Sequence, residues 1–336
     1  MRRLIALLLL AAPALGAQDG PAAELTRARA LVREVALYQL DRPARAAAAG
    51  VEAVRLLAAS QDPAAAALRV TAQADLAVAY VGLGRYDSAA TATAAARAQA
   101  ERTGDRVGLA HAIWSDGVLA QRRGEPERAA GHFTEALALQ RAAGADSAAA
   151  SSLNYLGFVY ATDLPDYGRA LGYQLESLRL RERLGHPAPL ASTLNSLGVL
   201  YGRLHEYDRA HGYYARALDL YRALGDSGGR GRAAGTLSNM GDLHLERGDA
   251  RGGLAYHRES LRMRAPVGDR WSLSLAHRNV ALAQLALGRP AAARAEMDTA
   301  MRLGAGTGNR GLTVRNLLAL AALERAGGRP RAAEAA

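Results

Sequence analysis

The chain has 336 residues, of which 50% are hydrophobic, 5% aromatic and 22% charged, and its formal net charge is +10. All 42 basic side chains are arginines, and cysteine is absent. A phosphate-binding P-loop and a Schiff-base site need lysine, and thiol nucleophiles and cysteine-based zinc or iron–sulfur sites need cysteine. The composition therefore excludes these classes of chemistry.

The first seventeen residues have the pattern of a secretory signal peptide. Met1–Arg3 is short and positively charged, Leu4–Ala12 is uncharged and apolar, and small residues follow Pro13. We expect a signal peptide over residues 1–17 and an exported mature chain, periplasmic or extracellular. The alternative is an internal hydrophobic helix at a misassigned start. No later stretch is long and apolar enough to suggest a transmembrane segment in the mature chain.

The remainder of the chain repeats about every forty residues, a period that is typical of stacked helical units. Strands are not indicated, because no run alternates β-branched or aromatic residues with polar ones. We expect an all-α protein in which residues 18–336 form one domain of helical repeats. The first repeat, at about 22–62, is weak because Glu34 stands where a small residue belongs, and the last, at about 311–336, is incomplete.

Small and bulky residues recur at fixed places in each unit of two helices. A small residue in the first helix allows the second helix to cross closely. It recurs as Ala77, Gly117, Gly157, Gly198, Gly241, Ala281 and Ala321. The bulky residue early in the second helix is Phe133, Tyr214, His257 or Met297. Glycines in the turn between the helices, such as Gly84, Gly124, Gly248 and Gly288, suit a left-handed helix end.

This pattern resembles the tetratricopeptide repeat (TPR) family in its longer form, most clearly over Leu197–Ala217. The resemblance implies an α-solenoid, a right-handed superhelix of about eight antiparallel helix pairs. It also implies a concave groove, lined by the first helices, that receives an extended peptide or a partner's helix. The spacing departs from forty at Asp163–Pro165 and at Asp226–Gly235, and we expect the second, glycine-rich insertion to form a longer loop rather than a hinge.

The resemblance also places candidate binding residues on the groove wall. An asparagine recurs there, and it either hydrogen-bonds the backbone of a ligand or holds the neighbouring repeat. Trp114 either anchors a partner or packs between units. The candidates for the peptide- or protein-binding groove are Asn154, Asn195, Asn239, Asn279, His111, Trp114, Gln121, Arg122, Arg203, Asp242, Glu246 and Arg278.

Catalytic and metal-binding motifs are not indicated. The histidines mostly occupy repeat positions that packing explains, and Gly304–Gly308 lacks the strand that a dinucleotide fingerprint requires. We therefore expect no enzyme, no cofactor, no metal and no nucleic-acid partner. The function expected is a non-catalytic scaffold, in the cell envelope or secreted, that binds a protein or an extended peptide. Two alternatives are a regulatory module acting through a separate effector and an envelope-structural protein binding anionic polymers through the +8 charge left after processing.

Overall fold

The computed structural model describes residues 21–38, 43–60, 62–225, 227–266, 270–305 and 310–326. These residues form fifteen α-helices and no strand. The helices are α1 (Pro21–Tyr38), α2 (Pro43–Leu57), α3 (Pro63–Gly82), α4 (Tyr86–Thr103), α5 (Arg106–Arg123), α6 (Pro126–Ala142), α7 (Asp146–Thr162), α8 (Tyr167–Leu184), α9 (Pro187–Arg203), α10 (Tyr207–Ala223), α11 (Ser227–Glu246), α12 (Ala250–Arg264), α13 (Arg270–Ala286), α14 (Pro290–Ala305) and α15 (Arg310–Ala326).

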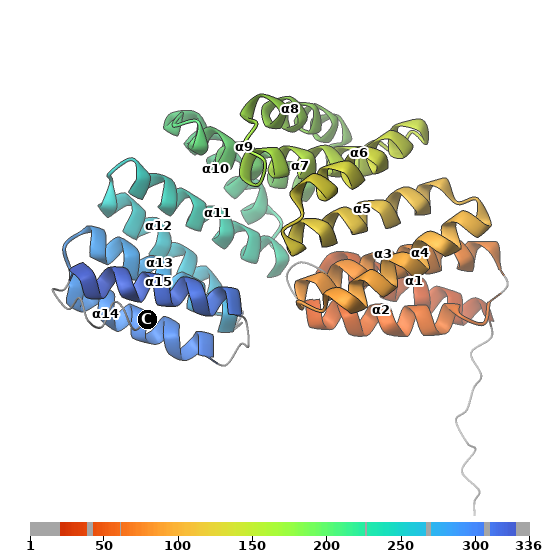
Figure 1. The fold of residues 1–336 in the computed structure, drawn as a ribbon, viewed down its shortest axis with the longest axis horizontal. Coiled ribbons are helices and arrows are strands. Elements are labelled where there is room, and N and C mark those ends of the chain that lie inside the picture. The colour runs from red at the N-terminus through yellow and green to blue at the C-terminus, as the bar shows by residue number, and fades with distance from the viewer. Residues whose placement is uncertain are drawn as a thin grey trace, which may run out of the picture.

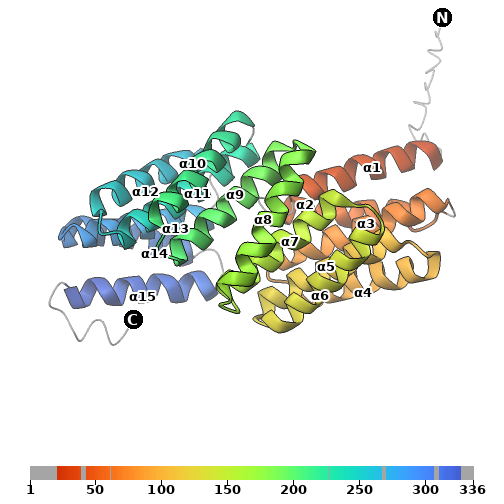
Figure 2. The same ribbon diagram turned by 90° about the horizontal axis from the view of Figure 1, so that it is seen from above.

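Consecutive helices pair in antiparallel fashion, and the pairs follow an arch from α1 to α15 (Figure 1). Seen from above, the pairs stack side by side (Figure 2). From α3 to α13, each odd-numbered helix contacts its own partner and the odd-numbered helices of the neighbouring pairs, whereas the even-numbered helices are splayed apart on the outer side. The protein is therefore an all-α solenoid whose odd-numbered helices form its inner, concave wall.

The expected pairing of small and bulky residues is confirmed in the helix pairs whose small residue is Gly117, Gly198 or Gly241. A Cβ atom added to Gly198 would lie 2.5 Å from the ring of Tyr214, and one added to Gly241 would lie 2.5 Å from the ring of His257. Gly157 faces Gln174 in the same way. Gln174 is the bulky partner that the repeat pattern missed, because an inserted residue shifts the second helix of that unit. Glycine at these points is thus required by close packing.

Serines at the later small position add a polar contact to the same interface. Ser177 Oγ donates to the carbonyl of Ala150 at 2.7 Å, and Ser260 Oγ donates to that of Ala234 at 2.7 Å. The bonds join the second helix of a pair to its first helix, and both serines are buried. A buried hydroxyl needs such an acceptor, so the repeat tolerates serine in place of alanine without an unsatisfied polar group.

The glycines between paired helices end their helices as expected. Gly84, Gly124, Gly248 and Gly288 all have positive φ, and Gly104 ends α4 in the left-handed region. Asp105 then caps α5 by accepting a hydrogen bond from the backbone nitrogen of Gly108 at 2.8 Å.

The glycine-rich insertion does not form the expected loop. Residues 227–235 belong to α11, which has 20 residues, so most of the extra length extends an inner helix by part of a turn. Glycine is a poor helix former but is not forbidden, and packing against α10 and α12 holds this segment in helical form. The weak first repeat does form a pair, α1 and α2, in which Glu34 makes an ion pair with Arg45 at 2.5 Å.

Two further expectations lie outside the described residues: the signal peptide over 1–17 and the second helix of the last unit beyond 326. None of the described helices combines the length and the apolarity that a membrane crossing requires.

Candidate binding groove

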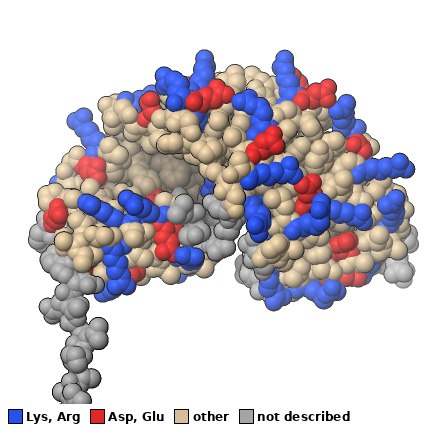
Figure 3. Space-filling view, turned by 180° about the vertical axis from the view of Figure 1, so that it is seen from behind, with Lys and Arg blue, Asp and Glu red and all other residues tan. Residues whose placement is uncertain are grey.

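The hollow under the arch is largely free of charged side chains on the face shown in Figure 3, whereas arginine and acidic side chains crowd its outer rim. The wall of this groove consists of the odd-numbered helices. Phe158 on α7 is 37% exposed, and Val199 at the equivalent place on α9 is half-buried. The middle of the wall therefore offers an apolar surface, and polar candidates lie on both sides of it along the chain.

The four asparagines occupy different environments. Asn239 Nδ2 on α11 donates to Asn195 Oδ1 on α9 at 3.2 Å, which joins two repeats. Asn154 on α7 is buried, and its Oδ1 accepts no hydrogen bond from any described residue. Asn279 on α13 is buried and accepts from Arg278 Nη2 at 3.1 Å. The hydrogen bond between Asn239 and Asn195 thus joins neighbouring repeats. Contact with a ligand stays a prediction for all four.

Trp114 and His111 on α5 pack into the structure. The indole lies 5.1 Å from the ring of Tyr155 and 6.4 Å from that of Phe133, measured between centroids, and its Nε1 is buried without a hydrogen-bond partner among the described residues. His111 Nε2 lies 3.1 Å from Asp75 Oδ1 on α3. Burial lowers the pKa of His111, but the carboxylate of Asp75 opposes this more strongly, and the net shift is upward. These contacts tie neighbouring units together.

The C-terminal ends of the inner helices carry polar side chains with free hydrogen-bonding capacity. Arg122 on α5, Arg203 on α9 and Glu246 on α11 are exposed, and within the described residues none of them makes an ion pair or a hydrogen bond. Gln121 Nε2 donates to Asp163 Oδ2 at 3.3 Å, just beyond the end of α7. Three charged groups are therefore available to a ligand along one edge of the groove.

Asp242 stands in the wall beside the buried ring of His257. Its side chain is 55% exposed, and its Oδ1 lies 3.4 Å from His257 Nε2. Although the carboxyl is open to the groove, the surrounding concave wall disfavours its charged form and raises its pKa to about 6; the charge of Arg278 opposes this shift. Arg278 is half-buried, with Nη1 lacking a partner among the described residues, and burial lowers its pKa.

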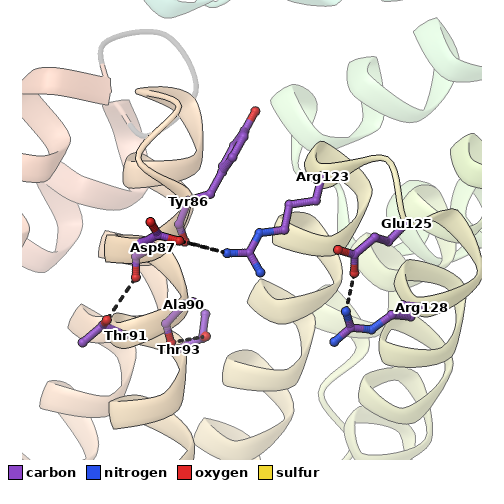
Figure 4. A network of polar contacts seen from close by, with 8 residues as sticks. All are labelled: Tyr86, Asp87, Ala90, Thr91, Thr93, Arg123, Glu125 and Arg128. Atoms are coloured by element: carbon purple, nitrogen blue, oxygen red, sulfur yellow. Dashed lines mark hydrogen bonds and ion pairs between the residues drawn. The ribbon is translucent and has the colours of Figure 1, made fainter.

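On the outer surface, several arginines pair with acidic residues of a neighbouring repeat. An Arg–Glu pair bridges each consecutive pair of outer helices from α4 to α12: Arg97–Glu135, Arg141–Glu176, Arg216–Glu182 and Arg222–Glu259. Arg123 at the end of α5 reaches Asp87 of α4 at 3.5 Å and the carbonyl of Tyr86 at 3.4 Å (Figure 4). We call the four Arg–Glu pairs the outer ladder.

The outer ladder is a feature that the sequence pattern did not reveal. Its partners are 34 to 38 residues apart, close to one repeat, so a search for opposite charges at that separation could have found it. Exposed ion pairs each contribute about 0–1 kcal/mol. Their main consequence is that four of the outer arginines are neutralised locally.

A metal ion would need several histidine, aspartate or glutamate side chains close together in the part of the chain that the structure describes. No group of three or more histidine, aspartate or glutamate side chains there is placed to hold a metal ion. What the geometry offers is an extended wall with an apolar middle, amides and several charged groups without partners. Such a wall can contact a long ligand at many points.

Helix pairs stacked into an arch, with their inner helices lining a groove, define an α-solenoid. A family model described as Tetratricopeptide repeat matches residues 147–223, which span α7 to α10. This match and the architecture together support a tetratricopeptide repeat protein. No protein in the curated set matches the sequence significantly.

Solved structures with the same fold are numerous. BtubC (BKLC) from P. vanneervenii is 27% identical, with a TM-score of 0.54 over 71% of this chain and 92% of that chain. The Rap protein complexed with Competence and Sporulation Factor is 12% identical, with a TM-score of 0.67 over 89% of this chain and 80% of that one. NprR in complex with its cognate peptide NprX is 14% identical, with a TM-score of 0.61 over 92% and 86%. The last two show a shared fold alone.

Proposed function

We propose that this protein is a non-catalytic scaffold that binds a protein or an extended peptide in its concave groove, in the cell envelope or outside the cell. The observation that carries the proposal is the set of charged side chains on the inner helices that have no ion-pair partner in the part of the chain that the structure describes. The arginines of the outer ladder have acidic partners, whereas Arg122, Arg203 and Glu246 on the inner helices have none among the described residues. Charges left unpaired on a concave wall are available to a ligand.

The shape of the groove favours an elongated ligand. Its wall is built from successive inner helices, and exposed Phe158 lies in the middle of it. Two structures of the same fold, the Rap protein and NprR, were solved with Competence and Sporulation Factor and with the peptide NprX, respectively. These neighbours make a peptide the first ligand class to test.

Binding of anionic polymers is the less favoured function, because the outer ladder neutralises several of the arginines that such a polymer would contact. The two functions differ in their dependence on salt. Binding through charge alone falls steeply by about 0.3 M salt, where the Debye length is well below 10 Å. Binding through apolar contacts and amide hydrogen bonds persists at that salt concentration.

The experiment is a selection of peptides from a random displayed library by the purified chain lacking residues 1–17, at about 0.05 and 0.3 M salt. The result expected is a family of related peptides that still bind at the higher salt. Polyphosphate serves as the polymer probe in parallel. Recovery of no peptide, together with salt-sensitive retention of polyphosphate, would contradict the proposal and favour the polymer-binding function.

A further inference from the structure

Asp242 and Glu246 present two negative charges on one face of α11. They are four residues apart, which places them one helical turn from each other, and both are exposed. Like charges at this spacing destabilise a helix by a few tenths of a kcal/mol. Within the described residues no arginine forms an ion pair with either carboxylate. The wall of the groove therefore holds two neighbouring carboxylates that form no ion pair with an arginine of the described residues.

The buried side chain beneath this pair does not neutralise it. His257 on α12 is 1% exposed, and neither of its ring nitrogens makes a hydrogen bond in the described part of the chain. Its Nε2 points toward Asp242 Oδ1 at 3.4 Å. Burial lowers the pKa of His257 to about 4, so the ring is neutral at physiological pH. In three other repeats this place is occupied by Phe133, Tyr214 or Met297, and in the repeat of Gly157 it is occupied by Gln174.

The neighbouring elements supply charges that frame the acidic pair. Arg278 on α13 attracts the charge of Asp242 from outside ion-pair distance, and Glu246 on α11 repels it. Tyr214 on α10 is buried, and the negative charges of Asp242 and Glu246 help to raise its pKa while Arg203 on α9 opposes them. The acidic pair thus lies between an arginine on the preceding inner helix and one on the following inner helix.

We propose that Asp242 and Glu246 form a subsite for a cationic side chain, lysine or arginine, of a peptide bound in the groove. This inference rests on the function proposed above. An ammonium or guanidinium group between the two carboxylates would relieve their repulsion and form charge-assisted hydrogen bonds. An apolar residue of the same peptide would then reach the wall at Phe158 and Val199.

The subsite also gives binding a dependence on pH. Asp242 carries its negative charge only above its pKa of about 6, and the groups that act on it are Glu246, His257 and Arg278. Between pH 7.5 and 5.0 the charged fraction of such a group falls about tenfold. A cationic ligand should therefore bind more weakly at pH 5.0, by less than the tenfold expected when both carboxylates are neutralised.

The test repeats the displayed-library selection with three proteins: the wild type, Asp242→Asn/Glu246→Gln, and the control Glu182→Gln/Glu259→Gln. The control removes the same charge from the outer ladder and leaves the groove untouched. Helical circular dichroism and the thermal midpoint establish that all three are folded. A peptide selected by the wild type is then measured by fluorescence anisotropy at pH 7.5 and 5.0.

The expected result is enrichment of lysine or arginine at one position with the wild type and the control, and loss of that enrichment with Asp242→Asn/Glu246→Gln. The selected peptide should bind the groove variant about tenfold more weakly, which corresponds to about 1.4 kcal/mol. Peptides that show no basic preference, or a preference that the groove variant retains, overturn the subsite and leave the peptide-binding function standing. Recovery of no peptide by any of the three proteins overturns both.

Discussion

Asn239 on α11 donates a hydrogen bond from Nδ2 to Oδ1 of Asn195 on α9, across 3.2 Å. The two residues lie 44 positions apart in consecutive repeats: Asn195 is three residues before Gly198, and Asn239 is two residues before Gly241. Asparagine is a mediocre helix former, and this bond gives it a structural role in the middle of two inner helices. The same amides keep further donors and acceptors that a ligand can use.

The asparagines should differ in their contribution to stability. Asn239→Ala removes the link between α9 and α11 and should lower the free energy of unfolding by about 0.5–1.5 kcal/mol. Asn154→Ala should be neutral or slightly stabilising, because the Asn154 side chain makes no hydrogen bond with a described residue and alanine favours helix. Urea unfolding followed by circular dichroism measures both. Equal losses for the two variants would contradict the distinction.

Close packing at Gly198 predicts a cost for even a methyl group. A Cβ atom at this place would lie 2.5 Å from Tyr214, so Gly198→Ala should destabilise the protein by about 1–3 kcal/mol despite the better helix propensity of alanine. Gly212 on α10 is the matched control, since a Cβ atom there meets nothing within 4 Å. Gly212→Ala should stabilise by about 0.5–1 kcal/mol. Thermal unfolding of the two variants should shift in opposite directions, and a neutral Gly198→Ala would refute the packing argument.

The buried ring of His257 should make the free energy of unfolding depend on pH. The unfolded histidine binds a proton below about pH 6.5, whereas burial lowers the pKa of the folded ring to about 4. Stability should therefore be lost as pH falls from 6.5 toward 4, by about 3 kcal/mol for this group alone. Asp242 acts in the opposite direction, because its raised pKa lets the folded protein bind a proton before the unfolded one does.

Two variants separate these opposing effects. His257→Phe places at α12 the residue that faces Gly117 in another repeat, and it should lose less stability than the wild type between pH 7.5 and 4.5. Asp242→Asn should lose more stability than the wild type over the same pH range. Urea unfolding at the two pH values provides the comparison. If acidification changed the stability of all three proteins equally, the burial of a neutral His257 would be wrong.

Much of the fold could be predicted from the sequence because small and bulky residues recur at the same positions in each repeat. The small residues at Gly117 and Gly198, and the bulky ones at Phe133 and Tyr214, face each other as expected. The rule fails where a residue is inserted, and Gln174 was therefore overlooked as the partner of Gly157. Residues 227–235 suggested a loop by composition, but packing between neighbouring helices overrides the weak helix propensity of glycine.

The groove was harder to predict than the fold. Periodicity identified inner-helix positions, yet it did not reveal which side chains find partners within the protein. Trp114 and His111 are held by neighbouring units, whereas Arg203 and Glu246 remain free of ion pairs within the described residues. That difference depends on distances between helices that are one repeat apart. A sequence period fixes the order of such helices and leaves those distances undetermined.

A ligand that occupies the concave groove should be excluded by a bulky side chain in its wall, and a glycine on α11 allows a direct test. Gly235 on α11 lies seven residues, about two helical turns, before Asp242 and so shares its face of the helix. A Cβ atom added to Gly235 meets nothing within 4 Å, so we expect Gly235→Tyr to fill the groove without straining the protein. Gly212→Tyr places the same side chain on outer helix α10, where a Cβ atom also meets nothing within 4 Å. The measurement is the affinity of a library-selected peptide for both variants by fluorescence anisotropy. We predict a loss of at least about tenfold for Gly235→Tyr and none for Gly212→Tyr; equal affinities for the two, or a loss confined to Gly212→Tyr, would contradict binding in the groove.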